Sequence, residues 1–437
     1  MNALEILQDL IKREWPVKLL SPLLGKYNPF HPEFRLDPYP SYRRLRQTAP
    51  VYKSPALQSL VLSCYGDVAA VLQDGRLGCD RTRSRLAQRT GLFEALRPDL
   101  RDAVLNSLLM LDAPDHTRLR RLVSKAFTPR VIRRLHERVT ELVAELLDEM
   151  ANKPDPDLIR DLADPLPLLV IAEMLGVPVE DRGQLKQWSN AAASILDPLQ
   201  AEGGMSSIEA AFDGLARHLH GVFADRRATP REDLVSALVA VEEQGDVLSE
   251  KELDSLCLLI LVAGNETTTN LIGNGVLALL HHPGERRRLQ DDPSIARPAI
   301  EELLRYDSPI QTTDRVALDD LEIQGRRVKK GDIVGLLLAS ANRDPMRFRD
   351  PDRLDLTRED NQHLAFGHGV HFCLGAQLAR LEGQIAITGL LERFPDLDAE
   401  RHPTTWKRSL VLRGLTSLPL RLGAARTSVF GPSAVAG

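Results

Sequence analysis

The stretch that decides the fold is Phe366-Gly367-His368-Gly369-Val370-His371-Phe372-Cys373-Leu374-Gly375. Glycines at 367 and 369 permit a tight loop whose backbone approaches its neighbours closely. The residues that follow, 376–382, favour a helix, so we expect Cys373 at a helix start, where unpaired amides and the helix dipole favour a thiolate. A thiolate held in this way can ligate iron. The alternative is a buried structural cysteine, which is the usual role of a lone cysteine.

This stretch agrees at every fixed position with Phe-Gly-x-Gly-x-His-x-Cys-x-Gly, and it therefore resembles the haem-binding signature of the cytochrome P450 family. The resemblance extends from about residue 28 to 422. It implies a mainly α fold with small β-sheets, the triangular helical prism of that family. It also implies haem b, with Cys373 as the axial iron ligand and Phe366, Gly367 and Gly375 as further contacts of the cofactor.

A second pattern is Glu302-Leu303-Leu304-Arg305, which matches the Glu-x-x-Arg of the family. The resemblance implies that this ion pair and Arg353, from Pro351-Asp352-Arg353-Leu354, lock the core beneath the haem. Leu354 departs from the pattern, because an aromatic residue is often found there. Taken alone, an i,i+3 charge pair more often decorates a solvated helix face.

A third pattern, His116-Thr117-Arg118-Leu119-Arg120, places His116 and Arg120 on one helix face, where they can grip one anionic group. The resemblance makes that group a haem propionate and adds Arg315 and His371 as further contacts. The alternative for each is an ordinary surface charge.

Other cations near this pattern could receive an electron donor. Arg118 and Arg121 point elsewhere on the same helix, because each residue turns it by about 100°. With Lys125 and Arg380 they could form a docking patch for an acidic protein, although a plain solvated face is an equal explanation.

The core helix carries Ala263-Gly264-Asn265-Glu266-Thr267-Thr268, which puts a glycine, an acid and a hydroxyl inside an apolar segment. Sequences tend to break local rules at functional sites. The resemblance implies that Ala263 and Gly264 border the haem, that Thr267 hydrogen-bonds the oxygen ligand and that Glu266 helps to deliver protons. The structural alternatives are a Thr267 hydroxyl bonded back to the Ala263 carbonyl and a Glu266 paired with a basic residue.

Composition excludes several classes of protein. The 56 Lys and Arg against 61 Asp and Glu give a net charge of -5, so we expect no nucleic-acid partner. Cys64, Cys79 and Cys257 form no Cys-x-x-Cys pair and are expected to be buried structural residues in a reducing, cytoplasmic setting. No secretory signal is present, and the apolar run 255–265 is too short to span a membrane, so no transmembrane anchor is expected.

Hydrophobic periodicity predicts helices over 112–150, 158–196, 206–226, 231–243, 249–282 and 296–306. A strand is predicted over Val61 to Tyr65 and short hairpins over 316–338. The prolines of the first 60 residues exclude continuous helix there. We expect a helical N-terminal extension over 1–27, one haem-binding domain over 28–423 and a flexible tail over 424–437.

The predicted function is that of a haem-thiolate monooxygenase that hydroxylates a fatty acid, steroid, terpenoid or polyketide. Since this sequence carries no flavin or ferredoxin domain, O2 and two electrons from a separate ferredoxin or flavodoxin with its reductase are implied. An epoxidase or C–C lyase remains open. The Glu266–Thr267 pair counts against an H2O2-driven peroxygenase and a non-catalytic haem sensor.

The substrate pocket can only be sketched from the sequence. Helical spacing and the resemblance suggest aliphatic lining, and core packing is an equal explanation for each aliphatic residue. The segment Asp197 to Ser207 is expected to be a mobile lid or a surface loop. The predicted lining residues are Leu108, Leu259, Val262, Ala263, Ile310, Gln311, Leu410 and Val411.

Overall fold

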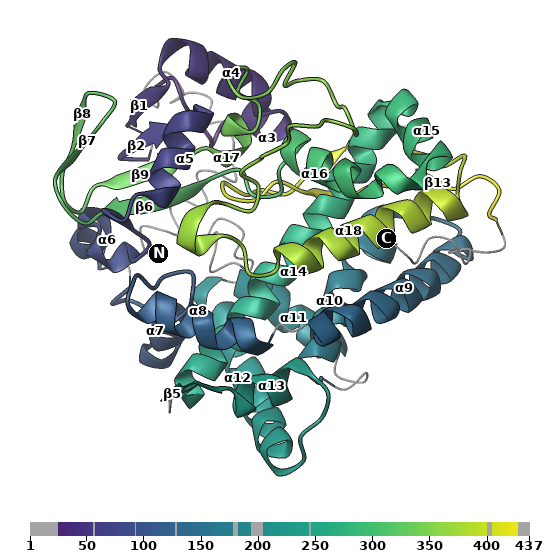
Figure 1. The fold of residues 1–437 in the computed structure, drawn as a ribbon, viewed down its shortest axis with the longest axis horizontal. Coiled ribbons are helices and arrows are strands. Elements are labelled where there is room, and N and C mark those ends of the chain that lie inside the picture. The colour runs from purple at the N-terminus through teal and green to yellow at the C-terminus, as the bar shows by residue number, and fades with distance from the viewer. Residues whose placement is uncertain are drawn as a thin grey trace.

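The computed structural model describes residues 25–426, except 56, 92, 127–128, 178–181, 194–203, 244–245 and 400–403, and the side chains of 125–134, 182, 190, 192–193, 204 and 242–243. The outline is roughly triangular, with helices filling most of it and one larger sheet at an edge (Figure 1). This agrees with the predicted helical prism. The predicted helix over 1–27 and the tail lie almost entirely outside the described residues. The lid or loop predicted over 197–207 lies outside them as far as residue 203, and its last four residues, 204–207, are the start of helix α12 (Gly204–Ala228) instead.

Helices make up most of the described chain. In chain order they are α3 (Pro32–Leu36), α4 (Tyr39–Thr48), α5 (Tyr65–Gln73), α6 (Arg85–Thr90), α7 (Pro98–Leu105), α8 (Asp115–Ala126), α9 (Pro129–Ala151), α10 (Pro165–Met174), α11 (Arg182–Ala193), α12 (Gly204–Ala228), α13 (Leu234–Ala240), α14 (Glu250–His281), α15 (Pro283–Asp291), α16 (Ala296–Tyr306), α17 (Leu338–Ala341) and α18 (Ala376–Arg393).

The larger sheet has the strand order β1-β2-β9-β6-β3, from β1 (Val51–Ser54), β2 (Ser59–Leu62), β3 (Leu77–Gly78), β6 (Thr313–Ala317) and β9 (Ile333–Leu336). Only β2 and β9 pair in parallel; the other neighbours are antiparallel. Four two-stranded ladders complete the β structure: β4 (Glu242–Glu243) with β5 (Asp246–Val247), β7 (Leu321–Ile323) with β8 (Arg326–Val328), β10 (Asp398–Ala399) with β13 (Leu420–Arg421), and β11 (Thr405–Trp406) with β12 (Leu415–Ser417).

The long helix α14 forms the centre of the main core, where it packs against α10, α11, α16 and α18. It begins at a capping box, in which Ser249 and Glu252 satisfy each other's backbone amides. By length and composition it could cross a membrane, but 67% of its most apolar window is buried inside the molecule. It is therefore the core helix that the sequence predicts over 249–282.

The prolines of the first 60 residues exclude a continuous helix, as predicted, but the short helix α4 forms there, because Pro38 is its N-cap and Pro40 lies in its first turn, where a missing N–H costs nothing. Other predicted bounds were wrong. The helix predicted over 112–150 is divided into α8 and α9, and the helix predicted over 158–196 is divided into α10 and α11. The strand predicted over 61–65 is β2, which ends at Leu62, and Tyr65 already begins α5. The hairpins predicted over 316–338 are confirmed as β6 to β9.

Candidate functional site

Cys373 lies in the turn between a short 3₁₀ segment, Gly369–His371, and α18, which begins at Ala376. Its backbone N–H donates to the Phe366 carbonyl at 3.0 Å. Cys373 retains surface exposure as a residue, although many neighbouring atoms surround its sulfur. The prediction that Cys373 starts the helix was therefore wrong by three residues.

The protein around Cys373 acts on the pKa of its thiol in both directions. Burial of the sulfur raises the pKa of the thiol, and this outweighs the lowering by the Gly375 amide and by the charges of Arg120 and Arg380. A metal ion that binds the sulfur displaces the proton directly. The bound iron, more than the loop, would set the ionised state of this cysteine.

The loop conformation requires its glycines. Gly367 and Gly369 have φ of 72° and 73°, in the left-handed region that other residues seldom adopt. A Cβ on Gly369 would also lie 2.7 Å from the Leu72 carbonyl at the end of α5. This close approach fixes the loop that presents Cys373.

Four basic groups predicted from separate parts of the sequence come together beside this loop. The rings of His116 and His371 lie 4.0 Å apart between centroids, and Arg120 donates to the Phe372 carbonyl at 2.8 Å. Burial, together with the charges of His116, Arg315 and Arg120, lowers the pKa of His371 to about 3. Like charges are therefore crowded here, as predicted for an anion site.

The cluster fits the carboxylates of a haem. Among the described residues, Arg120 and Arg315 form no ion pair with a carboxylate, so both guanidinium charges are available to an anionic group. Asp112 was not among the predicted site residues. One of its carboxylate oxygens lies within 4.8 Å of a ring nitrogen of His371, and the carboxylate accepts hydrogen bonds from the backbone amides of Cys79 and Asp80. It ties the end of β3 to the segment that begins α8.

On α14, Glu266 and Thr267 both make the structural contacts that the sequence offered as alternatives to catalysis. The Thr267 hydroxyl donates to the Ala263 carbonyl at 2.7 Å, and Glu266 forms an ion pair with Lys407 at 3.2 Å. Gly264 has a packing role, since a Cβ there would lie 2.9 Å from Ile171 of α10. These contacts hold the pair in place but do not exclude a catalytic role.

The predicted pocket residues divide into two groups. Leu259, Ala263 and Thr267, spaced i, i+4 and i+8, are partly accessible although most of α14 around them is buried, so they share one open face. Ile310, Leu410 and Val411 are also half-buried.

The other three predicted lining residues, Leu108, Val262 and Gln311, are buried in the described structure. The Gln311 amide donates to the Ser308 carbonyl at 2.7 Å and accepts from the Tyr42 hydroxyl at 3.0 Å. Gln311 therefore serves the core in this structure.

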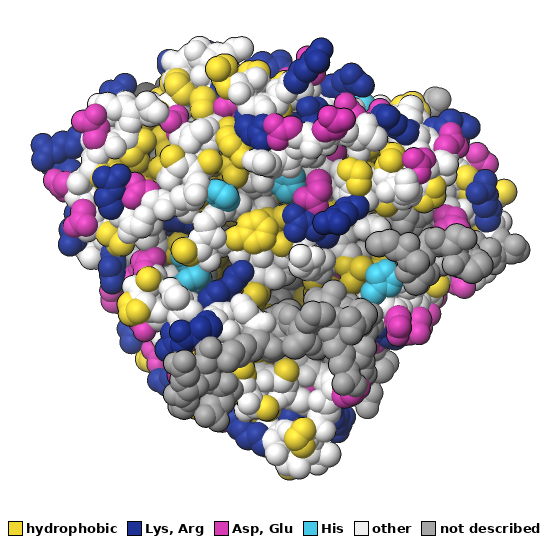
Figure 2. All heavy atoms as spheres, in the orientation of Figure 1, with side chains coloured by type: hydrophobic (Ala, Val, Ile, Leu, Met, Phe, Trp, Pro, Cys, Tyr) yellow, Lys and Arg dark blue, Asp and Glu magenta, His cyan; other side chains and the backbone are white. Residues whose placement is uncertain are grey.

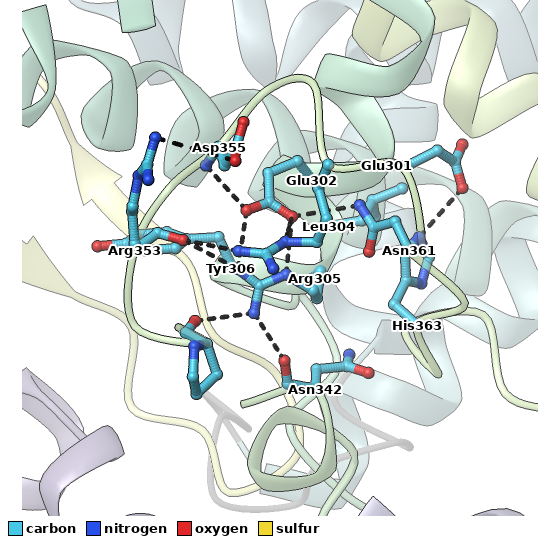
Figure 3. A network of polar contacts seen from close by, with 12 residues as sticks. Glu301, Glu302, Leu304, Arg305, Tyr306, Asn342, Arg353, Asp355, Asn361 and His363 are labelled. Carbon is cyan, nitrogen blue, oxygen red and sulfur yellow. Dashed lines mark hydrogen bonds and ion pairs between the residues drawn. The ribbon is translucent and has the colours of Figure 1, made fainter. Parts of the chain in front are cut away.

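The Glu-x-x-Arg pair is confirmed as a buried ion pair, and Figure 3 shows it at the centre of a polar network. Glu302 and Arg305 are 0% exposed and joined by two hydrogen bonds of 2.7 and 2.8 Å. Arg305 also donates to the carbonyls of Asn342 and Pro351, both at 2.8 Å. The solvated-face alternative is excluded for this pair.

The role predicted for the Arg353 side chain was wrong. That side chain is 65% exposed and, within the described part of the chain, pairs with Asp355 alone, at 4.0 Å, while its backbone carbonyl accepts a hydrogen bond from Arg305. The cation that completes the network is Arg358, whose Nε lies 3.1 Å from a Glu302 oxygen. Sequence reasoning missed it because the meander brings Arg358, five residues later, back over Glu302.

The predicted docking patch is only partly available. Arg118 pairs with Asp246 and Glu252, and Arg380 binds Glu301 through two hydrogen bonds. The side chain of Lys125 lies outside the described residues. Figure 2 shows Lys and Arg interspersed with Asp and Glu on this face, around hydrophobic atoms near its centre.

Comparison with known proteins decides the family. The model of the family described as Cytochrome P450 matches residues 187–413. The polyketide biosynthesis cytochrome P450 PksS of Bacillus subtilis (strain 168) is 40% identical over 405 residues, which cover 90% of this chain and 98% of that protein. This chain belongs to the cytochrome P450 family. It is also 40% identical to the vitamin D(3) 25-hydroxylase of Pseudonocardia autotrophica over 400 residues, 90% of this chain and 96% of that one.

A solved structure agrees with the assignment. CYP109E1 of Bacillus megaterium in complex with testosterone superposes with a TM-score of 0.79 at 33% identity, covering 89% of this chain and 100% of that one. The P450 is therefore a haem-thiolate monooxygenase that hydroxylates a hydrophobic small molecule. It uses O2 and electrons from redox partners.

Proposed function

We propose that this P450 hydroxylates a polyketide or a steroid-like molecule at the open face of α14, with Cys373 as the axial ligand of its haem iron. The observation that carries this assignment is the accessible Cys373 beside a cluster of basic groups free to bind carboxylates. His116, Arg120, Arg315 and His371 would hold the two propionates. When bound, the haem supplies the O2 activation that no protein side chain provides.

The substrate class follows from the lining and from the relatives. Leu259, Ala263, Leu410 and Val411 present aliphatic surface, which suits a large apolar molecule. The named relatives include a polyketide biosynthesis enzyme and a vitamin D(3) hydroxylase, and testosterone is bound in a related structure. These names support a polyketide or a steroid as the substrate.

Glu266 and Thr267 would handle protons next to the bound oxygen. A carboxylate can carry protons inward only if it reaches both a proton source and the hydroxyl beside the reacting atoms. Glu266 precedes Thr267 directly on α14, and its side chain is 12% exposed, which leaves it some contact with solvent. We assign proton delivery to this pair and O2 rather than H2O2 as the oxidant.

The electron donor would be a separate acidic ferredoxin or flavodoxin, served by its reductase, in the cytoplasm. Beside the cysteine loop, Val370 is 70% exposed and Phe372 39% exposed, and Arg120 of α8 donates to the Phe372 carbonyl. An apolar patch with basic neighbours suits a transient complex with a small acidic protein.

A substrate screen tests this proposal. The resting spectrum would be titrated with macrolides, steroids and fatty acids, and each compound that shifts it to high spin would be incubated with O2, ferredoxin and reductase. We expect a polyketide or steroid to give a product that gains one oxygen atom. Conversion of fatty acids alone, or equal turnover with H2O2 and no electron donor, would contradict it.

A further inference from the structure

Three side chains of the kinds that bind metal ions meet beside the cysteine loop, from separate parts of the chain. Cys79 directly follows β3, Asp112 lies just before α8, and His371 ends the short 3₁₀ segment of the loop. The Cys79 sulfur, a carboxylate oxygen of Asp112 and a ring nitrogen of His371 all lie within 4.8 Å of one another. Cys79 is 5% exposed, whereas Asp112 and His371 are half-buried, so part of the cluster remains accessible.

The ligand types and their spacing suit a zinc ion. Thiolate, imidazole and carboxylate are the three kinds of ligand that proteins offer to Zn²⁺. Around a tetrahedral zinc ion, ligand atoms held at about 2.0–2.3 Å from the metal lie about 3.3–3.8 Å from one another. The separations in this cluster would have to close by at most about 1.5 Å, which small changes of side-chain torsion provide.

Contacts outside the cluster already orient two of the three ligands. Asp112 accepts hydrogen bonds from the backbone amides of Cys79 and Asp80, at 2.7 and 3.4 Å. A carboxylate offers about four lone-pair sites, so these two bonds leave it able to bind a metal ion. The His371 ring is hydrogen-bonded to the Leu108 backbone. Metal-binding histidines usually make such a bond through the ring nitrogen that does not touch the metal.

The charges around the cluster fit a divalent cation once the haem is bound. Cys79 as a thiolate and Asp112 supply two negative charges, and Asp112 forms no ion pair with any residue that the structure describes. Of the neighbouring cations, Arg81 is paired with Asp314 at 2.6 Å, and Arg315 would be neutralised by a propionate. A bound Zn²⁺ would therefore leave the buried charges of this region paired.

We propose that Cys79, Asp112 and His371 form a zinc site separate from the haem iron, and that zinc competes with a haem propionate for His371. The competition rests on the proposed role of His371 as a propionate contact. Since one ring nitrogen is held by the Leu108 backbone, the other serves either the zinc ion or the propionate. Zinc takes the sulfur, the carboxylate and this nitrogen, with water in the fourth position. The thiol proton and the proton that His371 donates to the propionate pass to solvent.

The zinc content of the haem-loaded protein tests the site. Wild type and variants would be dialysed to equilibrium against the same zinc buffer, and bound metal would be measured by atomic absorption. We expect one zinc ion more per chain in the wild type than in Cys79→Ala. The matched control is Cys64→Ala, which removes a half-buried cysteine outside the cluster and should keep the wild-type zinc content.

Cobalt in place of zinc identifies the ligand atoms. Co²⁺ should add thiolate-to-metal absorption to the difference spectrum of the wild type and of Cys64→Ala, and none to that of Cys79→Ala. Asp112→Asn keeps the shape of the side chain but removes its charge, and it should weaken cobalt binding at least about tenfold. The reduced-CO spectrum of each variant shows whether the haem site is intact.

Haem transfer to apomyoglobin measures the competition. Zinc should speed haem loss from the wild type about tenfold, the factor that corresponds to losing one hydrogen bond to a charged group. In Cys79→Ala the rate of haem loss should not respond to zinc, because the ion no longer reaches His371.

Equal zinc content in the wild type and in Cys79→Ala, or an equal loss of zinc in Cys64→Ala, would overturn the site. Zinc binding without faster haem loss would overturn the competition for His371. Failure of the proposed function would look different, because the wild-type protein would then lack the thiolate spectrum or form no oxygenated product, whatever its zinc content.

Discussion

Two buried polar regions flank the site, and they differ in how completely their hydrogen bonds are made. Beneath the cysteine loop, every side-chain nitrogen of Arg305 and both oxygens of Glu302 have partners. On the polar face of α14, both amide atoms of Asn270 and the side-chain oxygen of Asn274 are buried without a partner among the described residues. At the Glu302–Arg305 pair the full set of partners holds the geometry, although the side-chain oxygen of the neighbouring Asn361 is buried without a partner among the described residues. Unpaired buried groups cost stability and suit a region that exchanges partners or water.

Removing one member of the complete network should have the largest effect on stability. Arg305→Ala leaves the Glu302 carboxylate buried without its main partner, so we expect a loss of about 3–5 kcal/mol in the free energy of unfolding. Urea unfolding of the haem-loaded protein measures it. The matched control is Arg353→Ala, an exposed arginine expected to cost no more than about 0.5 kcal/mol. Equal losses would show that the network is not closed as described.

On the other side, the contact between α14 and the C-terminal segment should be sensitive to one methyl group. Gly414→Ala places a Cβ against Asn270, and overpacking of this kind costs about 1–3 kcal/mol in unfolding free energy. Gly284→Ala in α15 is the control, because the added methyl group would meet no atom within 4 Å. Equal losses of unfolding free energy in the two variants would contradict the close contact between Gly414 and Asn270.

Glu382 of α18 gives a third, pH-dependent comparison. Full burial raises the pKa of this carboxyl to about 8 from a usual value near 4.5. The folded chain therefore holds a proton that the unfolded chain releases, and stability should fall as pH rises from about 4.5 to 8, by up to about 1.4 kcal/mol per pH unit. Unfolding of Glu382→Gln should show a flatter pH dependence. If the free energy of unfolding had the same pH dependence in the wild type and in Glu382→Gln, a group other than Glu382 would be responsible for it.

Thr267→Ala should change stability least, because the one hydrogen bond that its hydroxyl makes to a described residue goes to the Ala263 carbonyl of its own helix. We expect a change within about 0.5 kcal/mol, while electrons are diverted from product to peroxide. Peroxide and product measured together against electron donor consumed give the result. Unchanged coupling would mean that the hydroxyl has only its helical role.

Sequence reasoning recovered what local patterns encode. The period of apolar residues predicted α14 within one residue at each end, and the glycine and cysteine spacing predicted the loop. It could not predict contacts fixed by the path of the chain. Lys407 lies 141 residues from Glu266, and Arg358 reaches Glu302 only because of the irregular meander.

The ionisation of Cys373 was also beyond sequence reasoning. The expected amide donor is present at Gly375, but the helix begins three residues later than expected, and burial of the sulfur raises the pKa of the thiol against it. Such a balance depends on how many atoms surround the sulfur, which no short motif specifies.

Ligation of the iron by Cys373 is tested by the difference spectrum of the dithionite-reduced, CO-bound protein, recorded for the wild type and for Cys373→Ser. We predict a Soret band near ~450 nm in the wild type, because thiolate ligates the iron, and its loss in the variant. A wild-type band near ~420 nm, or a variant that keeps the ~450 nm band, would contradict the assignment of Cys373 as the iron ligand.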